Sequence, residues 1–149
     1  MTLHNRMKLE FLGLPENVSF SRVVVATFAS QLGFTLDDLE EIKVATSEAV
    51  SNAIIHGYQN QPGGVVRLES CLGNDWLEIK IEDDGVGIAN IEQAMQPAYT
   101  TCSERMGLGF SFMQSFMDEV KVESTVNRGT RITLRKLVKV NNAHLMKEH

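Results

Sequence analysis

The chain is poor in cysteine, with Cys71 and Cys102 as its only two. Their separation matches no metal-binding motif, and two cysteines are too few for the disulfide framework of a small secreted protein. The sequence also lacks an apolar run long enough to cross a bilayer, and Lys8, Glu10 and Pro15 interrupt the region where a signal peptide would be apolar. We therefore expect a cytoplasmic protein that has no contact with a membrane.

An excess of basic residues is missing as well. Lysine and arginine together number 14, and aspartate and glutamate number 19, which gives a net charge of −5. This balance argues against a direct nucleic-acid partner, because such proteins usually carry a basic face. With 43% hydrophobic and 22% charged residues, the composition is typical of globular proteins. The length predicts a single domain, which we place at residues 1–140, followed by a polar, frayed tail at 141–149.

Hydrophobic periodicity predicts strands at 7–12, 65–72, 76–81, 119–124 and 130–138, helices at 18–32, 36–58 and 107–116, and a weak helix at 91–95. Residues 97–105 have no periodicity, which predicts a mobile loop. These elements favour an α/β fold in which helices pack on one face of a single-layer mixed β-sheet. In the first helix we expect the apolar side chains to face the core, namely those of Phe20, Val23, Val24 and Phe28.

The helix predicted at 36–58 carries three polar side chains beside its apolar stripe. Glu48, Asn52 and His56 are spaced four residues apart, so they line one ridge of the helix. The amide oxygen of Asn52 suits a hard cation such as magnesium, and the Glu48 carboxylate suits a general base. For His56, a role at the C-terminus of the helix is the simpler one. From this stretch alone, a solvated helix edge is the commoner explanation.

A second motif, Asp83-x-Gly85-x-Gly87, follows a predicted strand. An ionised carboxylate only accepts hydrogen bonds, so Asp83 suits the exocyclic amine of adenine and rejects the carbonyl of guanine. The two glycines allow the backbone to approach a flat base and its sugar closely. Alone the motif is weak, because surface turns built from aspartate and glycine are commoner than ligand sites.

Two further glycine motifs follow in the chain. Gly107-x-Gly109 stands at the predicted start of a helix, where free backbone N–H groups favour phosphate. Gly129 and Thr130 come just before and at the start of the last predicted strand, and taken alone they are an ordinary turn followed by a strand. Neither motif indicates a ligand by itself.

Taken in order, these motifs resemble those of the GHKL superfamily of ATPases and kinases, which includes gyrase, heat-shock chaperones, histidine kinases and mismatch-repair proteins. The E-x-x-x-N box of that superfamily is matched by Glu48 and Asn52, its D-x-G-x-G box by Asp83, Gly85 and Gly87, its G-x-G box by Gly107 and Gly109, and its G-T pair by Gly129 and Thr130. The order and spacing of all four make the resemblance specific. It implies that residues 1–140 form an ATP-binding α/β sandwich.

Three runs, at residues 20–23, 47–58 and 116–120, narrow the resemblance. They are similar to the anti-sigma F factors, a family of serine kinases that control sporulation in endospore-forming bacteria. The likeness covers nearly the whole chain, although the lid at 99–105 looks shorter here. It implies a homodimer that holds the sporulation sigma factor F inactive when ATP is bound, and that phosphorylates a serine of an anti-anti-sigma factor.

The resemblance also implies roles for individual residues. Glu48 would activate the substrate serine, Asn52 would ligate Mg²⁺, and Arg22 would lie on the surface that faces the partner proteins. Asp83 would hold the adenine amine, with the Thr130 hydroxyl assisting. The full set that would contact ATP is Asn52, Asp83, Gly85, Gly87, Arg105, Gly107, Gly109 and Thr130.

Three alternative functions remain open. A histidine-kinase catalytic domain would follow a helical dimerisation segment, and the six residues before the first expected strand do not supply one. A serine kinase of a stress-response sigma factor would share most of these motifs. A nucleotide-gated binding protein without significant catalysis is the third, and the presence of Glu48 counts against it.

Overall fold

The structure is a computed structural model that describes residues 2–96 and 102–139, with the backbone alone described over 102–106. In chain order its elements are β1 (Asn5–Leu12), α1 (Pro15–Ala29), α2 (Leu36–Asn52), the π-helical turn η1 (Ala53–Gly57), β2 (Val65–Leu72), β3 (Trp76–Asp83), α3 (Ile91–Met95), α4 (Cys102–Phe116), β4 (Glu119–Thr125) and β5 (Gly129–Leu137). The tail predicted at 141–149 and residues 97–101 of the expected loop lie outside the described residues.

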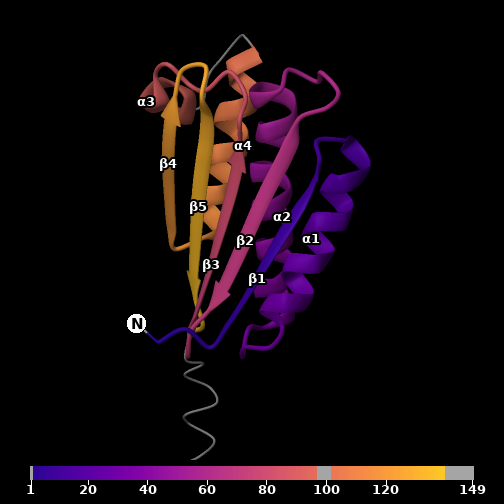
Figure 1. Ribbon diagram of the computed structural model, residues 1–149. Helices are drawn as coiled ribbons and strands as arrows, with labels where there is room; N and C mark the ends of the chain where they lie inside the picture. The colour runs from indigo at the N-terminus through magenta and orange to yellow at the C-terminus, as the bar shows by residue number, and fades with distance from the viewer. Residues whose placement is uncertain (1, 97–101, 140–149) are drawn as a thin grey trace, which may run out of the picture.

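The strands form one five-stranded sheet in the order β1-β2-β3-β5-β4, and the helices cover one of its faces (Figure 1). This arrangement confirms the predicted α/β class and the placement of the helices. The expectation of a mixed sheet is wrong, because every pairing is antiparallel. The physical reason is that two helices, α1 and α2, separate β1 from β2 and return the chain to the end of the sheet that it left.

The core lies between the sheet and the helices. The strands alternate between buried and more exposed residues, so each places one row of side chains against the helices. The largest fully buried side chains are those of Val25, Ile42, Val50, Val66, Leu68, Leu72, Leu77, Ile79, Ile81, Phe110, Met113 and Leu134. Among the described residues, no helix is long and apolar enough to cross a membrane.

Helix α1 begins earlier than the periodicity predicts. Pro15 occupies the first helical positions, where its missing N–H and fixed φ are favourable, so this proline starts the helix instead of preceding it. Helix α2 begins at a capping box in which the Thr35 side chain accepts from the N–H of Asp38 and the Asp38 carboxylate accepts from the N–H of Thr35. The proline and the capping box thus define where α1 and α2 begin, and the C-terminal end of α2 carries residues of the candidate site.

The end of the second helix differs from a regular α-helix. After Asn52 the chain forms the π-helical turn η1, in which the N–H of Tyr58 bonds to the carbonyl of Ala53, five residues earlier. Such turns occur mostly as single turns in α-helices and are frequent at functional sites. Here the turn places Gly57 directly against the end of β3.

Candidate functional site

The predicted site residues gather where α2 ends, β3 ends and β5 begins, at the upper end of the molecule in Figure 1. Two adjoining cavities occupy this region on the helix-covered side of the sheet. Asn52 and His56 line both of them, so the two cavities meet at the last turn of α2 and the start of η1. Residues from four distant parts of the chain are thereby brought together.

The first cavity lies between α2 and α4 and has a volume of about 140 Å³. Glu48, Asn52 and Gly109 line it. Gly109 is close to the catalytic candidate, because a Cβ atom added at Gly109 would lie 2.9 Å from Oε2 of Glu48. The carboxylate of Glu48 and the amide of Asn52, both on α2, therefore face one small space whose opposite wall is α4.

The amide of Asn52 is incompletely satisfied. Within the described residues its Nδ2 atom is buried and has no hydrogen-bond partner. A buried polar group in this state costs about 1–3 kcal/mol. Rotation of the amide about its last bond exchanges oxygen and nitrogen, so either atom can be presented to a ligand. This is the chemistry expected of a residue that binds a metal ion or a phosphate oxygen.

The second cavity is narrow, about 20 Å³, and is lined by Asp83, Gly87 and Thr130 in addition to the two shared residues. The side chain of Asp83 points into the helix-covered side of the sheet, and only 7% of the residue is exposed. Its Oδ1 atom accepts a hydrogen bond from the N–H of Gly85 at 2.9 Å. Asp83 pairs with Thr130 across β3 and β5, which brings a hydroxyl beside the carboxylate.

Burial raises the pKa of Asp83 from its ordinary 3.8 to about 6. The backbone N–H groups of Gly85 and Thr130 and the charge of Arg67 oppose this rise in pKa, whereas the neighbouring Asp84 adds to it. The carboxyl group is therefore ionised at neutral pH, but at a free-energy cost. A ligand N–H that donates to it would reduce that cost.

Two glycines allow Asp83 and η1 to pack together. A Cβ atom added at Gly57 would lie 2.7 Å from Oδ1 of Asp83, and one added at Gly85 would lie 2.0 Å from the carbonyl oxygen of Gly57. Gly87 has a φ of +76°, a backbone conformation that residues with a side chain rarely adopt. The two glycines of the D-x-G-x-G motif are thus required by close packing and by backbone conformation, respectively.

Tyr58 joins the elements around the second cavity, and sequence reasoning missed it. Its hydroxyl donates to the carbonyl of Val65 at 2.6 Å and accepts from the N–H of Asp84 at 2.8 Å. Burial raises the pKa of this phenol, so it remains a donor at neutral pH. The sequence gives no spacing from which this contact between η1, β2 and the end of β3 could be inferred.

The G-x-G motif lies in a different setting from the one predicted. Helix α4 begins at Cys102, so Gly107 and Gly109 stand inside the helix rather than at its start. Backbone N–H groups inside a helix are bonded four residues back and do not form a phosphate cradle. The expectation of free N–H groups at these glycines is therefore wrong, and the smallness of Gly109 beside Glu48 is what the structure shows. The side chain of Arg105 lies outside the described residues.

The exposed face of α1 also differs from the prediction. Phe20 and Val23 were expected in the core, yet they are 50% and 53% exposed. The buried residues of α1 are instead Ser21, Val25, Ala26 and Ala29, on a helix that packs against the neighbouring α2. Arg22 is exposed as well, and Phe20 and Val23, three residues apart, are neighbours on the helix surface. We call the surface formed by Phe20, Arg22 and Val23 the α1 patch.

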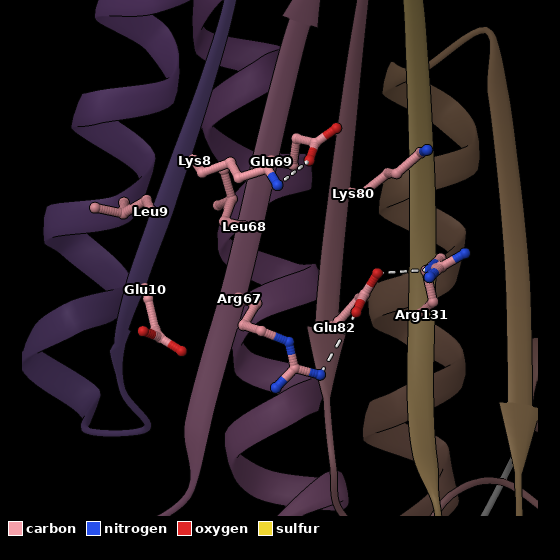
Figure 2. A pocket seen from close by; sticks show the side chains of 9 residues that line it. All are labelled: Lys8, Leu9, Glu10, Arg67, Leu68, Glu69, Lys80, Glu82 and Arg131. Atoms are coloured by element: carbon pink, nitrogen blue, oxygen red, sulfur yellow. Dashed lines mark hydrogen bonds and ion pairs between the residues drawn. The ribbon is translucent and has the colours of Figure 1, made fainter.

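A further hollow, of about 440 Å³, lies on the other face of the sheet (Figure 2). Its charged side chains are mostly paired across strands: Lys8 with Glu69, Arg67 with Glu82, and Glu82 with Arg131. Arg67 also donates two bonds to Asp84, at 2.7 and 2.8 Å, which lower the pKa of that carboxyl group. None of the described residues that line this hollow belongs to the predicted site.

The fold and the residues that line the two cavities are those of a histidine kinase-like ATPase domain. The family model of that description matches residues 11–136. A solved histidine kinase domain from Erythrobacter litoralis has a TM-score of 0.51 and 25% identity, over 68% of this chain and 45% of that chain. The solved RsbU and RsbW domains of a Mycobacterium tuberculosis protein share the fold, with a TM-score of 0.65 and 18% identity, over 93% of this chain and 34% of that chain.

Known sequences narrow the class further. An anti-sigma F factor of Geobacillus sp. is 50% identical over 143 residues, which make up 95% of this chain and 98% of that protein. An anti-sigma F factor of Clostridium acetobutylicum is 52% identical over 136 residues, which make up 90% of this chain and 94% of that protein. The chain therefore belongs to the family of anti-sigma F factors.

Proposed function

We propose that this chain binds ATP with magnesium and transfers the γ-phosphoryl group to a serine of a partner protein. The observation that carries the proposal is that Glu48 and Asn52 line one cavity while Asp83 lines the adjoining one. ATP would place its base beside Asp83 and Thr130 and its phosphates beside Glu48 and Asn52. The residues 1–140 would act as one kinase domain.

The residues around Asn52 fit a magnesium ion. Among the described residues, no cluster of three His, Cys, Asp or Glu side chains could hold a metal. Magnesium usually keeps several waters and binds through one or two protein oxygens together with phosphate oxygens of the substrate, so a single amide is a sufficient protein ligand. The buried, unsatisfied amide of Asn52 meets that requirement. When bound, the ion would offset the charge that develops on the phosphate oxygens.

Glu48 would act on the incoming serine. The serine hydroxyl would approach Glu48, and its proton would pass to the Glu48 carboxylate as the bond from the serine oxygen to the γ-phosphorus forms. The bond between that phosphorus and the bridging oxygen would break, and ADP would leave. A positioned base of this kind contributes about 10²–10⁴ to the rate.

The partners follow from the family. By analogy with the anti-sigma F factors, this chain would bind the sporulation sigma factor F, with an anti-anti-sigma factor as the serine substrate, and it would act as a homodimer. The identities of about 50% to anti-sigma F factors support this assignment over a stress-response sigma factor. The α1 patch is a suitable contact surface, because it offers exposed apolar side chains and an arginine, a residue type that is enriched among interface anchors.

The experiment that tests the function mixes the purified chain with γ-labelled ATP, magnesium and a candidate anti-anti-sigma protein. We expect label on a serine of the partner, stable to acid, and no label when magnesium is chelated. Acid-labile label on a histidine would indicate a histidine kinase instead. ATP-dependent partner binding without any label would leave a binding protein and contradict the kinase proposal.

Arg22 provides a test of the docking surface. Arg22→Glu should weaken sigma-factor binding and partner phosphorylation together by at least about tenfold, which is 1.4 kcal/mol. The reason is that two partners that share one contact exclude each other without any long-range coupling. ATP affinity and the thermal midpoint should stay near those of the wild type, because Arg22 is exposed and lines neither cavity.

Lys43→Glu makes the same change of charge on α2 and serves as the control, since Lys43 lies on a different helix and, among the described residues, pairs with Glu40. It should affect partner binding less than Arg22→Glu does. Normal binding of both partners by the Arg22 variant would show that the α1 patch is not the shared contact.

A further inference from the structure

Ser124 is a half-buried residue of β4 whose hydroxyl makes three contacts at the edge of the second cavity. We call this the base cavity, because the proposed function places the base of ATP there. Its Oγ atom accepts from the N–H of Ile88 at 2.7 Å, donates to the carbonyl of Gly129 at 3.0 Å, and lies 2.8 Å from Oγ1 of Thr130. Ile88 and Thr130 both line the base cavity. One hydroxyl thus joins the segment after the D-x-G-x-G motif to the start of β5.

The direction of the third bond follows from counting protons. A serine hydroxyl has one proton to donate and two lone pairs to accept with. The carbonyl of Gly129 can only accept, so that bond uses the proton of Ser124. The N–H of Ile88 can only donate, so it uses one lone pair. All three contacts are made together only when the Thr130 hydroxyl donates to the remaining lone pair of Ser124.

We infer that Ser124 is a positioning residue of the nucleotide site, which fixes the Thr130 hydroxyl as an acceptor toward the base. With its proton held by Ser124, Thr130 presents only lone pairs to the cavity. Asp83 beside it is an acceptor too, so this corner accepts donated N–H or O–H bonds and opposes a carbonyl oxygen. Such a corner matches the amine at C6 of adenine, or a water that donates to Thr130, and disfavours a 6-oxo purine.

The inference rests on the proposed function, in that it assumes the base binds beside Asp83. The test compares the dissociation constants of ATP and inosine triphosphate, which carries a carbonyl in place of the amine, by calorimetry. Wild-type protein should prefer ATP. In Ser124→Ala the Thr130 proton is released and can donate to the carbonyl, so the preference for ATP should fall by about threefold or more, the worth of one neutral hydrogen bond.

A double-mutant cycle separates this role from a purely structural one. Ser124→Ala also removes the acceptor for the Ile88 N–H, and that loss should weaken both nucleotides equally and leave their ratio unchanged. In a Thr130→Val background, Ser124→Ala should no longer change the ratio, because the hydroxyl through which it acts is absent. Thr125→Ala, one residue along β4 and exposed, is the matched control and should change neither affinity.

The outcomes are distinct. If folded Ser124→Ala keeps the wild-type ratio, or changes it equally in the Thr130→Val background, Ser124 does not act through Thr130 and the inference fails. Should Ser124→Ala not fold, Ser124→Cys replaces it, because the thiol keeps the side-chain shape and forms only weak hydrogen bonds. The preference of Ser124→Cys for ATP over inosine triphosphate should then fall in the same way. Wild-type protein that binds neither nucleotide, or binds both equally, would instead contradict the proposed function.

Discussion

Glu48→Gln is expected to reduce phosphotransfer to the partner protein by about 10²–10⁴, the usual contribution of a positioned base. ATP affinity should stay within about threefold of the wild type, because glutamine keeps the size of glutamate and the proposed contacts to ATP are made by other residues, Asn52, Asp83 and Thr130. The measurement is a single-turnover assay at saturating ATP, together with calorimetry of ATP binding. A fall in rate at unchanged affinity assigns Glu48 to the chemical step.

Glu40→Gln is the matched control for this variant. Glu40 lies on the same helix and pairs with Lys43 at 3.0 Å on the exposed side of α2. Its replacement should leave both the rate and the affinity unchanged, since exposed pairs contribute little. If Glu48→Gln phosphorylates the partner at the normal rate, Glu48 is a residue of the cavity wall and another group must receive the serine proton.

Asp83→Asn is expected to weaken ATP binding and to stabilise the protein. Loss of a charged acceptor for the adenine amine should raise the dissociation constant by about 10- to 100-fold, which corresponds to 1.5–3 kcal/mol. At the same time the variant no longer buries a charge. The rise of the Asp83 pKa from 3.8 to about 6 corresponds to at most about 3 kcal/mol of lost stability at neutral pH. The free energy of unfolding should therefore increase at pH 7.5.

The contribution of Asp83 to the free energy of unfolding depends on pH, and its sign follows from the raised pKa. Burial raises the pKa of Asp83 in the folded protein above its ordinary value, so between about pH 6 and 3.8 the folded state holds a proton that the unfolded state has released. The contribution of Asp83 to stability is therefore unfavourable above pH 6, and this penalty is relieved as the pH falls toward 4. Denaturant unfolding of both proteins should show the stability advantage of Asp83→Asn shrinking over that range.

Asp84→Asn provides the contrasting control at the neighbouring carboxylate. Asp84 accepts two hydrogen bonds from Arg67 at the surface, and these lower its pKa instead of raising it. Its replacement should slightly destabilise the protein, by less than about 1 kcal/mol for a solvent-screened pair. An Asp83→Asn protein that is less stable than the wild type at pH 7.5 would show that hydrogen bonds to the carboxylate outweigh its burial.

Much of the fold follows from local patterns. The hairpin of β2 and β3 is expected from alternating apolar residues around a tight turn, and the order of helices and strands follows from their periods. The motif residues Glu48, Asn52 and Asp83 are found by spacing and resemblance. Their meeting at one place is a property of the tertiary structure, since the end of β3 with Asp83 packs against Gly57 of η1, which directly follows α2.

Other features depend on contacts that no single segment encodes. Phe20 and Val23 have the spacing of a buried stripe, but the buried face of α1 is formed by Ser21, Val25 and Ala29 instead. Gly107 and Gly109 suggest a helix start, yet α4 extends N-terminally to Cys102. The π-helical turn depends on a backbone bond that spans five residues, and the hydroxyl of Ser124 has partners 5 to 36 residues away; hydrophobic periodicity predicts neither.

The strand order has a consequence for self-association. β1 and β4 are the two edges of the sheet, and unpaired edges are templates on which a further strand can add and start an aggregate. Each edge strand alternates charged with apolar side chains, with Lys8 in the middle of β1 and Lys121 in β4. A strand added beside either of them would have to desolvate a row of charges. Both edges thus oppose amyloid-like pairing at high concentration, and recognition of an extended peptide by strand addition is disfavoured for the same reason.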